Sequence, residues 1–112
     1  MQKVEIIDYG VGNIHSLAKA FSKFDCKVRI STSVPATVSS AWVLPGVGAF
    51  SYASKRLGKM KKILRNEAQN SRPIFGICLG MQLLYESSEE GDGSGIGIFQ
   101  GKVKRLKHCN LP

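Results

Sequence analysis

The 112-residue chain is poor in acidic residues and cysteines, and it contains no long apolar run. Its 8 acidic residues are outnumbered by 16 lysines and arginines, which gives a formal net charge of +8. No apolar run approaches the roughly 18 residues that a membrane-spanning helix needs. The N-terminus also lacks the apolar stretch and small-residue cleavage site of a signal peptide. The sequence therefore predicts a cytoplasmic protein with no membrane partner.

The three cysteines, Cys26, Cys78 and Cys109, are odd in number and widely spaced. Because no C-x-x-C pair occurs, neither a zinc site nor a disulfide framework is indicated. We expect no bound metal, and we expect Cys26 and Cys109 to be chemically inert. The remaining cysteine lies in a different sequence context, which is described below.

The excess of positive charge raises the question of an acidic or nucleic-acid partner. Six of the cations lie within residues 55–65, where no aromatic residue stands among them. A stacking platform for single-stranded nucleic acid is therefore not supported, and we predict a solvated helix face with no nucleic-acid partner. The six residues are Lys55, Arg56, Lys59, Lys61, Lys62 and Arg65.

Short apolar runs alternate with helical patterns along one chain of ordinary globular composition, 43% apolar and 21% charged. The alternation predicts an α/β fold in which helices cover a parallel sheet, with no internal repeat or linker. Apolar runs predict strands over residues 3–8, 27–31, 41–44 and 73–77, and helical spacing predicts helices from 14, over 53–70 and over 79–87. Residues 91–95 are expected to form a loop, and residues 96–108 one or two strands.

Two apolar faces support the helix predictions. Asn13 can cap the first helix, because its side chain can accept a hydrogen bond from an N–H group of the first turn. Gly58 weakens the prediction of a single helix over 53–70. The residues that share a face are Ile14, Leu17, Ala18 and Phe21 in the first helix, and Ala53, Leu57, Met60, Leu64 and Ala68 in the second.

The stretch Gly76-Ile77-Cys78-Leu79-Gly80 places a cysteine between two glycines, where a strand is expected to turn into a helix. Flanking glycines allow close backbone approach at such a turn, which is the logic of the G-x-S-x-G nucleophile elbow with sulfur in place of oxygen. Free N–H groups at the start of the helix favour a thiolate, and the N–H of Leu79 would point towards an oxyanion. A small buried cysteine at a strand end explains the spacing equally well.

Two glycine-containing turns follow other predicted strands. Residues 45–50, PGVGAF, would open at the same edge of a parallel sheet as Cys78. Gly46 and Gly48 could let main-chain N–H groups approach a substrate, although an ordinary turn would look the same. Residues 8–13, DYGVGN, lack the full G-x-G-x-x-G spacing, so a dinucleotide site is not indicated.

The segments IIDYGVGNIHSLAKA, VLPGVGAF and GICLGMQLLYESSEEG together resemble the N-terminal part of a class I glutamine amidotransferase. Within that family, the likeness is to glutaminase subunits of imidazole glycerol phosphate synthase. It runs in order from residue 4 to about residue 106. The resemblance implies a flavodoxin-like α/β fold, with residues 1–112 forming the N-terminal portion of a single amidotransferase domain.

The resemblance also implies a set of functional residues and no cofactor. Cys78 would attack the carboxamide of glutamine, expel ammonia and leave a glutamyl thioester for water to hydrolyse. The released ammonia would serve a synthase (cyclase) subunit, held as a heterodimer, in histidine biosynthesis. The loop from Asp8 to Asn13 would face that partner. Val47 and Leu79 would supply the oxyanion hole, and Gly46, Gly48, Gln82 and Glu90 would line the glutamine pocket.

The resemblance implies that the family's catalytic histidine and glutamate lie in a C-terminal half, and we expect no counterpart to them within these 112 residues. His15 is expected at the surface, and His108 matches no catalytic position, so we expect the 112-residue chain alone to be inactive. Two alternatives remain open at this point. The chain could be a truncated, non-catalytic partner-binding module, or a related glutaminase that serves another amidation, such as surface-sugar synthesis.

Overall fold

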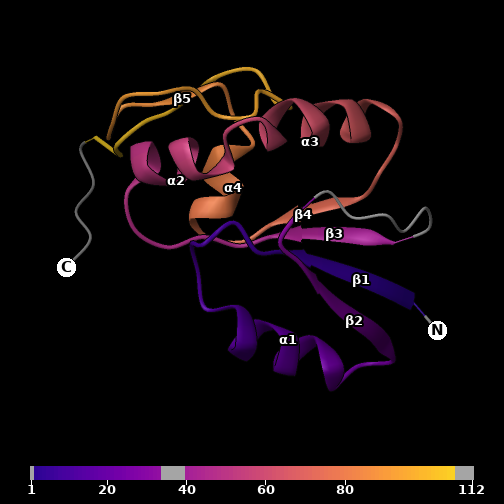
Figure 1. The fold of residues 1–112 in the computed structure, drawn as a ribbon. Coiled ribbons are helices and arrows are strands. Elements are labelled where there is room, and N and C mark those ends of the chain that lie inside the picture. The colour runs from indigo at the N-terminus through magenta and orange to yellow at the C-terminus, as the bar shows by residue number, and fades with distance from the viewer. Residues whose placement is uncertain (1, 34–39, 108–112) are drawn as a thin grey trace.

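The computed structural model describes residues 2–33 and 40–107. Four parallel strands form one sheet in the order β2-β1-β3-β4 (Figure 1). This is the strand order of a flavodoxin-like sheet over its first four strands, so the predicted α/β class is confirmed. The strands are β1 (Gln2–Ile7), β2 (Cys26–Ser31), β3 (Ala41–Leu44) and β4 (Ile74–Gly76).

Helices cover both faces of the sheet, as parallel strands require. Helix α1 (Ile14–Ser22) lies on one face, while α2 (Phe50–Leu57), α3 (Met60–Gln69) and α4 (Leu79–Leu83) lie on the other (Figure 1). Two short strands, β5 (Ser87–Ser88) and β6 (Lys102–Val103), pair in parallel apart from the main sheet. No helix in the described part of the chain is long and apolar enough to cross a membrane.

Two apolar layers hold the fold together, one on each face of the sheet. The larger lies under α2, α3 and α4, where Trp42, Phe50 and Leu64 are almost fully buried. The smaller is built on Val4, Ile6 and Val43, and the predicted apolar face of α1 packs against it. Asn13 caps α1 as predicted, because its side-chain oxygen accepts the Ser16 N–H at 3.4 Å.

The largest differences between the sequence-based boundaries and the structure lie in three places, while most other element ends shift by one to three residues. The predicted helix over 53–70 is two helices, since Gly58 adopts a φ of +51° that ends α2. The helix predicted over 79–87 ends at Leu83, beyond which the chain leaves to form β5. Within the described part of 96–108, the one strand is β6, and His108 and Cys109 lie outside the described residues.

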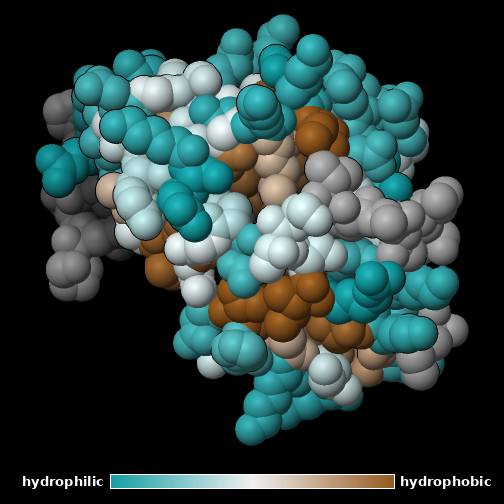
Figure 2. Space-filling view, viewed as in Figure 1, coloured by the Kyte–Doolittle hydropathy of each residue, from teal (hydrophilic) through white to brown (hydrophobic). Residues whose placement is uncertain are grey.

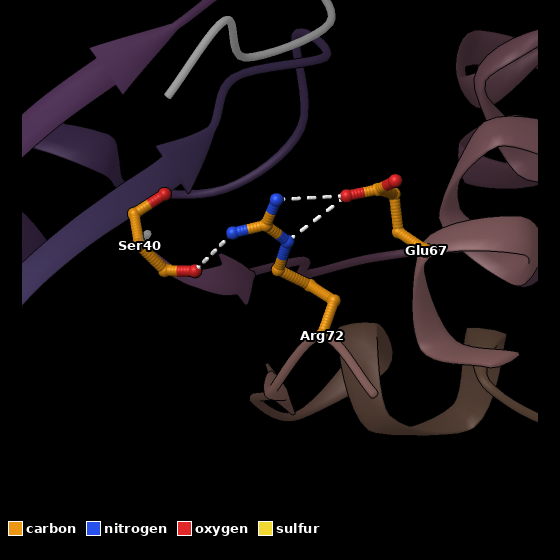
Figure 3. Close-up of polar contacts among 3 residues, drawn as sticks. All are labelled: Ser40, Glu67 and Arg72. Carbon is orange, nitrogen blue, oxygen red and sulfur yellow. Dashed lines mark hydrogen bonds and ion pairs between the residues drawn. The ribbon is translucent and has the colours of Figure 1, made fainter. Parts of the chain in front are cut away.

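The amino ends of β3 and β4 are fastened to α3 by Arg72 (Figure 3). Its guanidinium donates to Glu67 Oε1 at 2.9 and 3.0 Å, and to the Ser40 carbonyl oxygen at 2.6 Å. The same group lies 4.8 Å from the ring centre of Trp42. These contacts fix the start of the strand that leads to Cys78.

Candidate active site

Cys78 lies at the sharp turn between β4 and α4, as the glycine spacing predicts. Its backbone has a φ of +55°, a left-handed value that is uncommon for a residue with a side chain. Strained backbone of this kind is found most often at functional sites. The thiol is exposed to solvent, whereas Cys26 on β2 is only partly exposed. The turn therefore presents one exposed thiol at the carboxyl edge of the sheet.

The two flanking glycines are required by close backbone contacts. A Cβ atom on Gly76 would lie 2.8 Å from the Met81 backbone nitrogen, and one on Gly80 would collide with the carbonyl oxygen of Leu44. A side chain at either position would push α4 away from the sheet. The G-x-C-x-G spacing thus has the structural cause that the sequence analysis assigned to it.

The loop after β3 is hydrogen-bonded to this turn. The N–H of Ile77 donates to the Leu44 carbonyl oxygen at 3.0 Å, and the N–H of Leu79 donates to the Gly46 carbonyl oxygen at 3.2 Å. Sequence reasoning expected the Leu79 N–H to be open to an oxyanion. In this structure it is already engaged, so using it for an oxyanion requires that bond to break.

Gly46 and Val47 are placed differently by this loop. Gly46 is enclosed, since a Cβ atom there would lie 2.7 Å from the Tyr9 hydroxyl and 3.0 Å from the Gly80 nitrogen. Val47 is 61% exposed and lines a hollow that it shares with Asp8, Asn13 and His15. The loops after β1 and β3 therefore meet at the edge of the sheet that carries Cys78.

Tyr9 is a site residue that sequence reasoning missed. It is 5% exposed, and its hydroxyl donates to the Pro45 carbonyl oxygen at 2.6 Å. Burial raises the pKa of Tyr9, so the hydroxyl remains a donor. Arg56 on α2 holds the same residue, because its Nε donates to the Tyr9 carbonyl oxygen at 3.1 Å. The only signal in the sequence was a tyrosine at the end of a buried strand.

The remaining predicted pocket residues are not all brought to Cys78. Gln82 lies one helical turn after it, with its N–H 3.3 Å from the Cys78 carbonyl oxygen. The Gln82 side-chain oxygen is buried and has no hydrogen-bond partner. Glu90 lies beyond β5, where it lines a separate hollow with Glu89 and Arg105. Gly48 has a φ of +96° and open space around it.

Among the described residues, we identify neither a general base for Cys78 nor a group of metal ligands. His15 is exposed on α1, as expected, and it lines the hollow at Val47. Among residues 2–33 and 40–107, no group of three His, Cys, Asp or Glu side chains could hold a metal ion. Five of the six basic residues are exposed, as expected of a solvated helix face, although the Arg56 side chain also bonds the Tyr9 carbonyl oxygen. Lys61 is the exception, because its amine donates to Ser54 Oγ at 2.7 Å and burial lowers its pKa.

Comparison with known proteins places this sequence in a family. The family model described as "Glutamine amidotransferase class-I" matches residues 5–111. A protein of Prochlorococcus marinus (strain MIT 9211) named "Imidazole glycerol phosphate synthase subunit HisH" is 43% identical over 113 residues, covering 97% of this chain and 50% of that protein. Proteins with the same name from Bacillus licheniformis and Oceanobacillus iheyensis are 42% and 45% identical, over 96% and 92% of this chain.

This chain spans about half the length of these curated relatives, since it covers 52% and 53% of the latter two. The family match nevertheless extends over nearly all of this chain and includes the strained cysteine, its flanking glycines and the loop after β3. The chain belongs to the class I glutamine amidotransferase family.

Proposed function

We propose that this chain is the nucleophile-bearing, N-terminal portion of a single glutaminase domain that serves imidazole glycerol phosphate synthase. The domain hydrolyses glutamine to glutamate and ammonia, and the ammonia is used in histidine biosynthesis. The observation that carries the proposal is Cys78, an exposed thiol held at φ +55° between two glycines that tolerate no side chain. The names of the relatives supply the pathway.

The proposed chemistry follows from the position of the thiol. The Cys78 sulfur attacks the carboxamide carbon of glutamine, and the carbonyl electron pair moves onto oxygen. As this intermediate collapses, the carbonyl re-forms and the C–N bond breaks, with the nitrogen gaining a proton so that it leaves as ammonia. The glutamyl thioester that remains is hydrolysed by water to glutamate and the free thiol. Val47 and Leu79 are the proposed oxyanion donors, with Leu79 released from its bond to Gly46. The histidine and glutamate that would transfer protons belong to the second half of the domain.

Glutamine recognition is assigned to the residues around this turn. Gly46 and Gly48 let the backbone approach the substrate, and the buried, unpartnered oxygen of Gln82 can accept a hydrogen bond from it. Glu90 would pair with the substrate ammonium. The hollow between the loops after β1 and β3 supports a docking position for a synthase (cyclase) subunit, in a cytoplasmic heterodimer.

A glutamine-shaped diazoketone tests the proposal directly, because it alkylates a nucleophile only after binding beside it. We expect the folded chain to gain one adduct at Cys78, detected by peptide mass spectrometry, and glutamine to slow its formation. Labelling without added glutamine and the Cys78→Ser variant serve as controls, and Cys26 reports non-specific reaction. Equal labelling of Cys26 and Cys78, or labelling that glutamine does not slow, would contradict the proposed function.

A further inference from the structure

The loop after β3 changes abruptly from buried to exposed. Pro45 and Gly46 are buried directly after the strand, whereas residues 47–49 are exposed. The boundary between the two parts lies after Gly46, whose carbonyl oxygen accepts the Leu79 N–H at 3.2 Å. Because each peptide unit is planar and turns as one body, the way in which the buried part is held decides where that carbonyl oxygen points.

The buried part of this loop is held by Tyr9, which follows β1. The Tyr9 hydroxyl donates to the Pro45 carbonyl oxygen at 2.6 Å across 36 residues of chain, and the tyrosine is only 5% exposed. A buried carbonyl oxygen that loses its donor destabilises the folded state. The bond from Tyr9 therefore resists rotation of the Pro45–Gly46 peptide.

Gly46 lies between the Tyr9 hydroxyl and the start of α4. A Cβ atom on Gly46 would lie 2.7 Å from the Tyr9 hydroxyl, 3.0 Å from the Gly80 nitrogen and 3.2 Å from the Leu79 Cβ atom. The loop backbone thus fills the space between the tyrosine and the turn that carries Cys78. A shift of the hydroxyl would therefore be transmitted to Leu79, the residue directly after the cysteine.

Tyr9 can hold the loop only if it is itself fixed, and Arg56 on α2 supplies that attachment. The Arg56 Nε donates to the Tyr9 carbonyl oxygen at 3.1 Å. The guanidinium also lies against Gly10, where an added Cβ atom would collide with it. The backbone of the tyrosine is therefore attached to a helix, while its hydroxyl is attached to the loop after β3.

We propose that Tyr9 is a positioning residue for the Cys78 turn. Its hydroxyl holds the buried part of the loop after β3 against the start of α4, which keeps the Gly46 carbonyl oxygen on the Leu79 N–H. That the turn serves a reaction with glutamine rests on the proposed function. A tyrosine that only filled the core would need no hydroxyl, so Tyr9→Phe isolates the positioning contact.

The test is hydrogen exchange of single backbone amides, followed by NMR spectroscopy on the 112-residue chain, so it does not depend on turnover. The variant is Tyr9→Phe. The matched control is Tyr52→Phe, which removes a hydroxyl from a tyrosine that is 58% exposed on α2. The Leu79 amide reports on the loop, and the Ile77 amide is the internal reference, because it donates to the end of β3 instead.

We expect Tyr9→Phe to speed exchange at Leu79 by about 2- to 10-fold relative to Ile77, which corresponds to the net contribution of one hydrogen bond. Tyr52→Phe should leave this ratio unchanged. A general loss of stability would speed both amides alike. Equal acceleration at Leu79 and Ile77 in Tyr9→Phe, or no change at Leu79, would therefore overturn the inference.

Labelling of Cys78 by the glutamine-shaped diazoketone separates this inference from the proposed function. If glutamine does not slow labelling of the unaltered chain, the proposed function fails, and the exchange ratio still decides the role of Tyr9. If glutamine does slow it, Tyr9→Phe should be labelled more slowly relative to iodoacetamide, which needs no bound position, because a displaced turn aligns the thiol less well. An unchanged relative rate would overturn the positioning role of the hydroxyl and leave the proposed function intact.

Discussion

The backbone at Cys78 shows how single residues determine this site. A left-handed φ at a non-glycine residue costs of order 1 kcal/mol, and here the surrounding contacts compensate for it. Ile77 is hydrogen-bonded to Leu44 at the end of β3, and Leu79 to Gly46 in the loop that follows, which holds the turn on either side of the cysteine. This conformation places the thiol beyond the end of the sheet, where it is exposed to solvent.

Replacing Gly80 by alanine should destabilise the protein, because the added methyl group would collide with the Leu44 carbonyl oxygen. Neither backbone can move without displacing β3 or α4. We expect a loss of about 3 kcal/mol in the free energy of unfolding, at the upper end for overpacked sites, measured by urea denaturation.

Gly58→Ala is the matched control for this substitution. Gly58, unlike Gly80, has a positive φ, of +51°, and its nearest neighbour to an added Cβ is 3.6 Å away, so this variant carries backbone strain without a close contact. Gly58→Ala should therefore lower the free energy of unfolding only by the conformational strain, about 1–2 kcal/mol. Equal losses in the two variants would show that close packing at Gly80 does not maintain the turn.

Among single residues, the sequence predicted those whose role follows from their spacing along the chain. The glycines around Cys78 were predictable because a sharp turn has no room for side chains. The bond from Leu79 to Gly46 was not, since it depends on how the loop after β3 is rotated. Tyr9 was missed for a related reason: its partner, Pro45, is 36 residues away in the chain.

Among the helices, the division between α2 and α3 has a cause that periodicity alone does not reveal. Leu57 and Leu64 are buried on the same layer, so the apolar spacing continues across the break. Only the backbone of Gly58, at φ +51°, departs from helical geometry. A glycine inside a regular apolar pattern is compatible with either a continuous or a divided helix, and the sequence could not distinguish them.

The attachment of α3 to the amino ends of β3 and β4 depends on Arg72, whose side chain is 12% exposed. Arg72→Lys keeps the charge but removes the planar guanidinium that donates hydrogen bonds to Glu67 and to the Ser40 carbonyl oxygen (Figure 3). The stacking of this group on the Trp42 ring is lost as well. We expect a loss of about 1–3 kcal/mol in the free energy of unfolding, measured by urea denaturation.

Arg65→Lys provides the control, since Arg65 is an exposed cation on the same helix. A surface substitution of this kind should change stability by less than about 0.5 kcal/mol. If Arg72→Lys were as mild as Arg65→Lys, the contacts of the guanidinium would contribute little to the attachment of α3.

Over the whole molecule, the sheet is covered unevenly. Helix α1 packs on the side of β2, and Figure 2 shows an apolar patch at the surface between the sheet and α1. At the other end of the sheet, β4 is paired only with β3 among the described residues, and Phe75 on β4 is 58% exposed. An unpaired edge with an exposed aromatic side chain is a site for association.

The sequence predicted the parallel sheet because apolar runs and helical patterns alternate, but it could not predict which apolar residues remain exposed. Phe75 and Trp42 both lie in short apolar strands, yet Trp42 is 1% exposed. The difference arises from the neighbours on each face, because α3 and Arg72 cover Trp42. Exposure is a property of the assembled layers and not of either strand alone.

We therefore expect the chain to self-associate through the edge at β4, and Phe75→Lys to reduce that association. The net charge of +8 opposes contact between copies, so association should increase with salt, which screens the repulsion. Light scattering against protein concentration, at low and high salt, measures the effect. Phe24→Lys adds the same charge at a residue that is 72% exposed in the turn before β2. Because both variants change the charge equally, a reduction confined to Phe75→Lys would identify the β4 edge, whereas equal reductions would attribute the effect to charge.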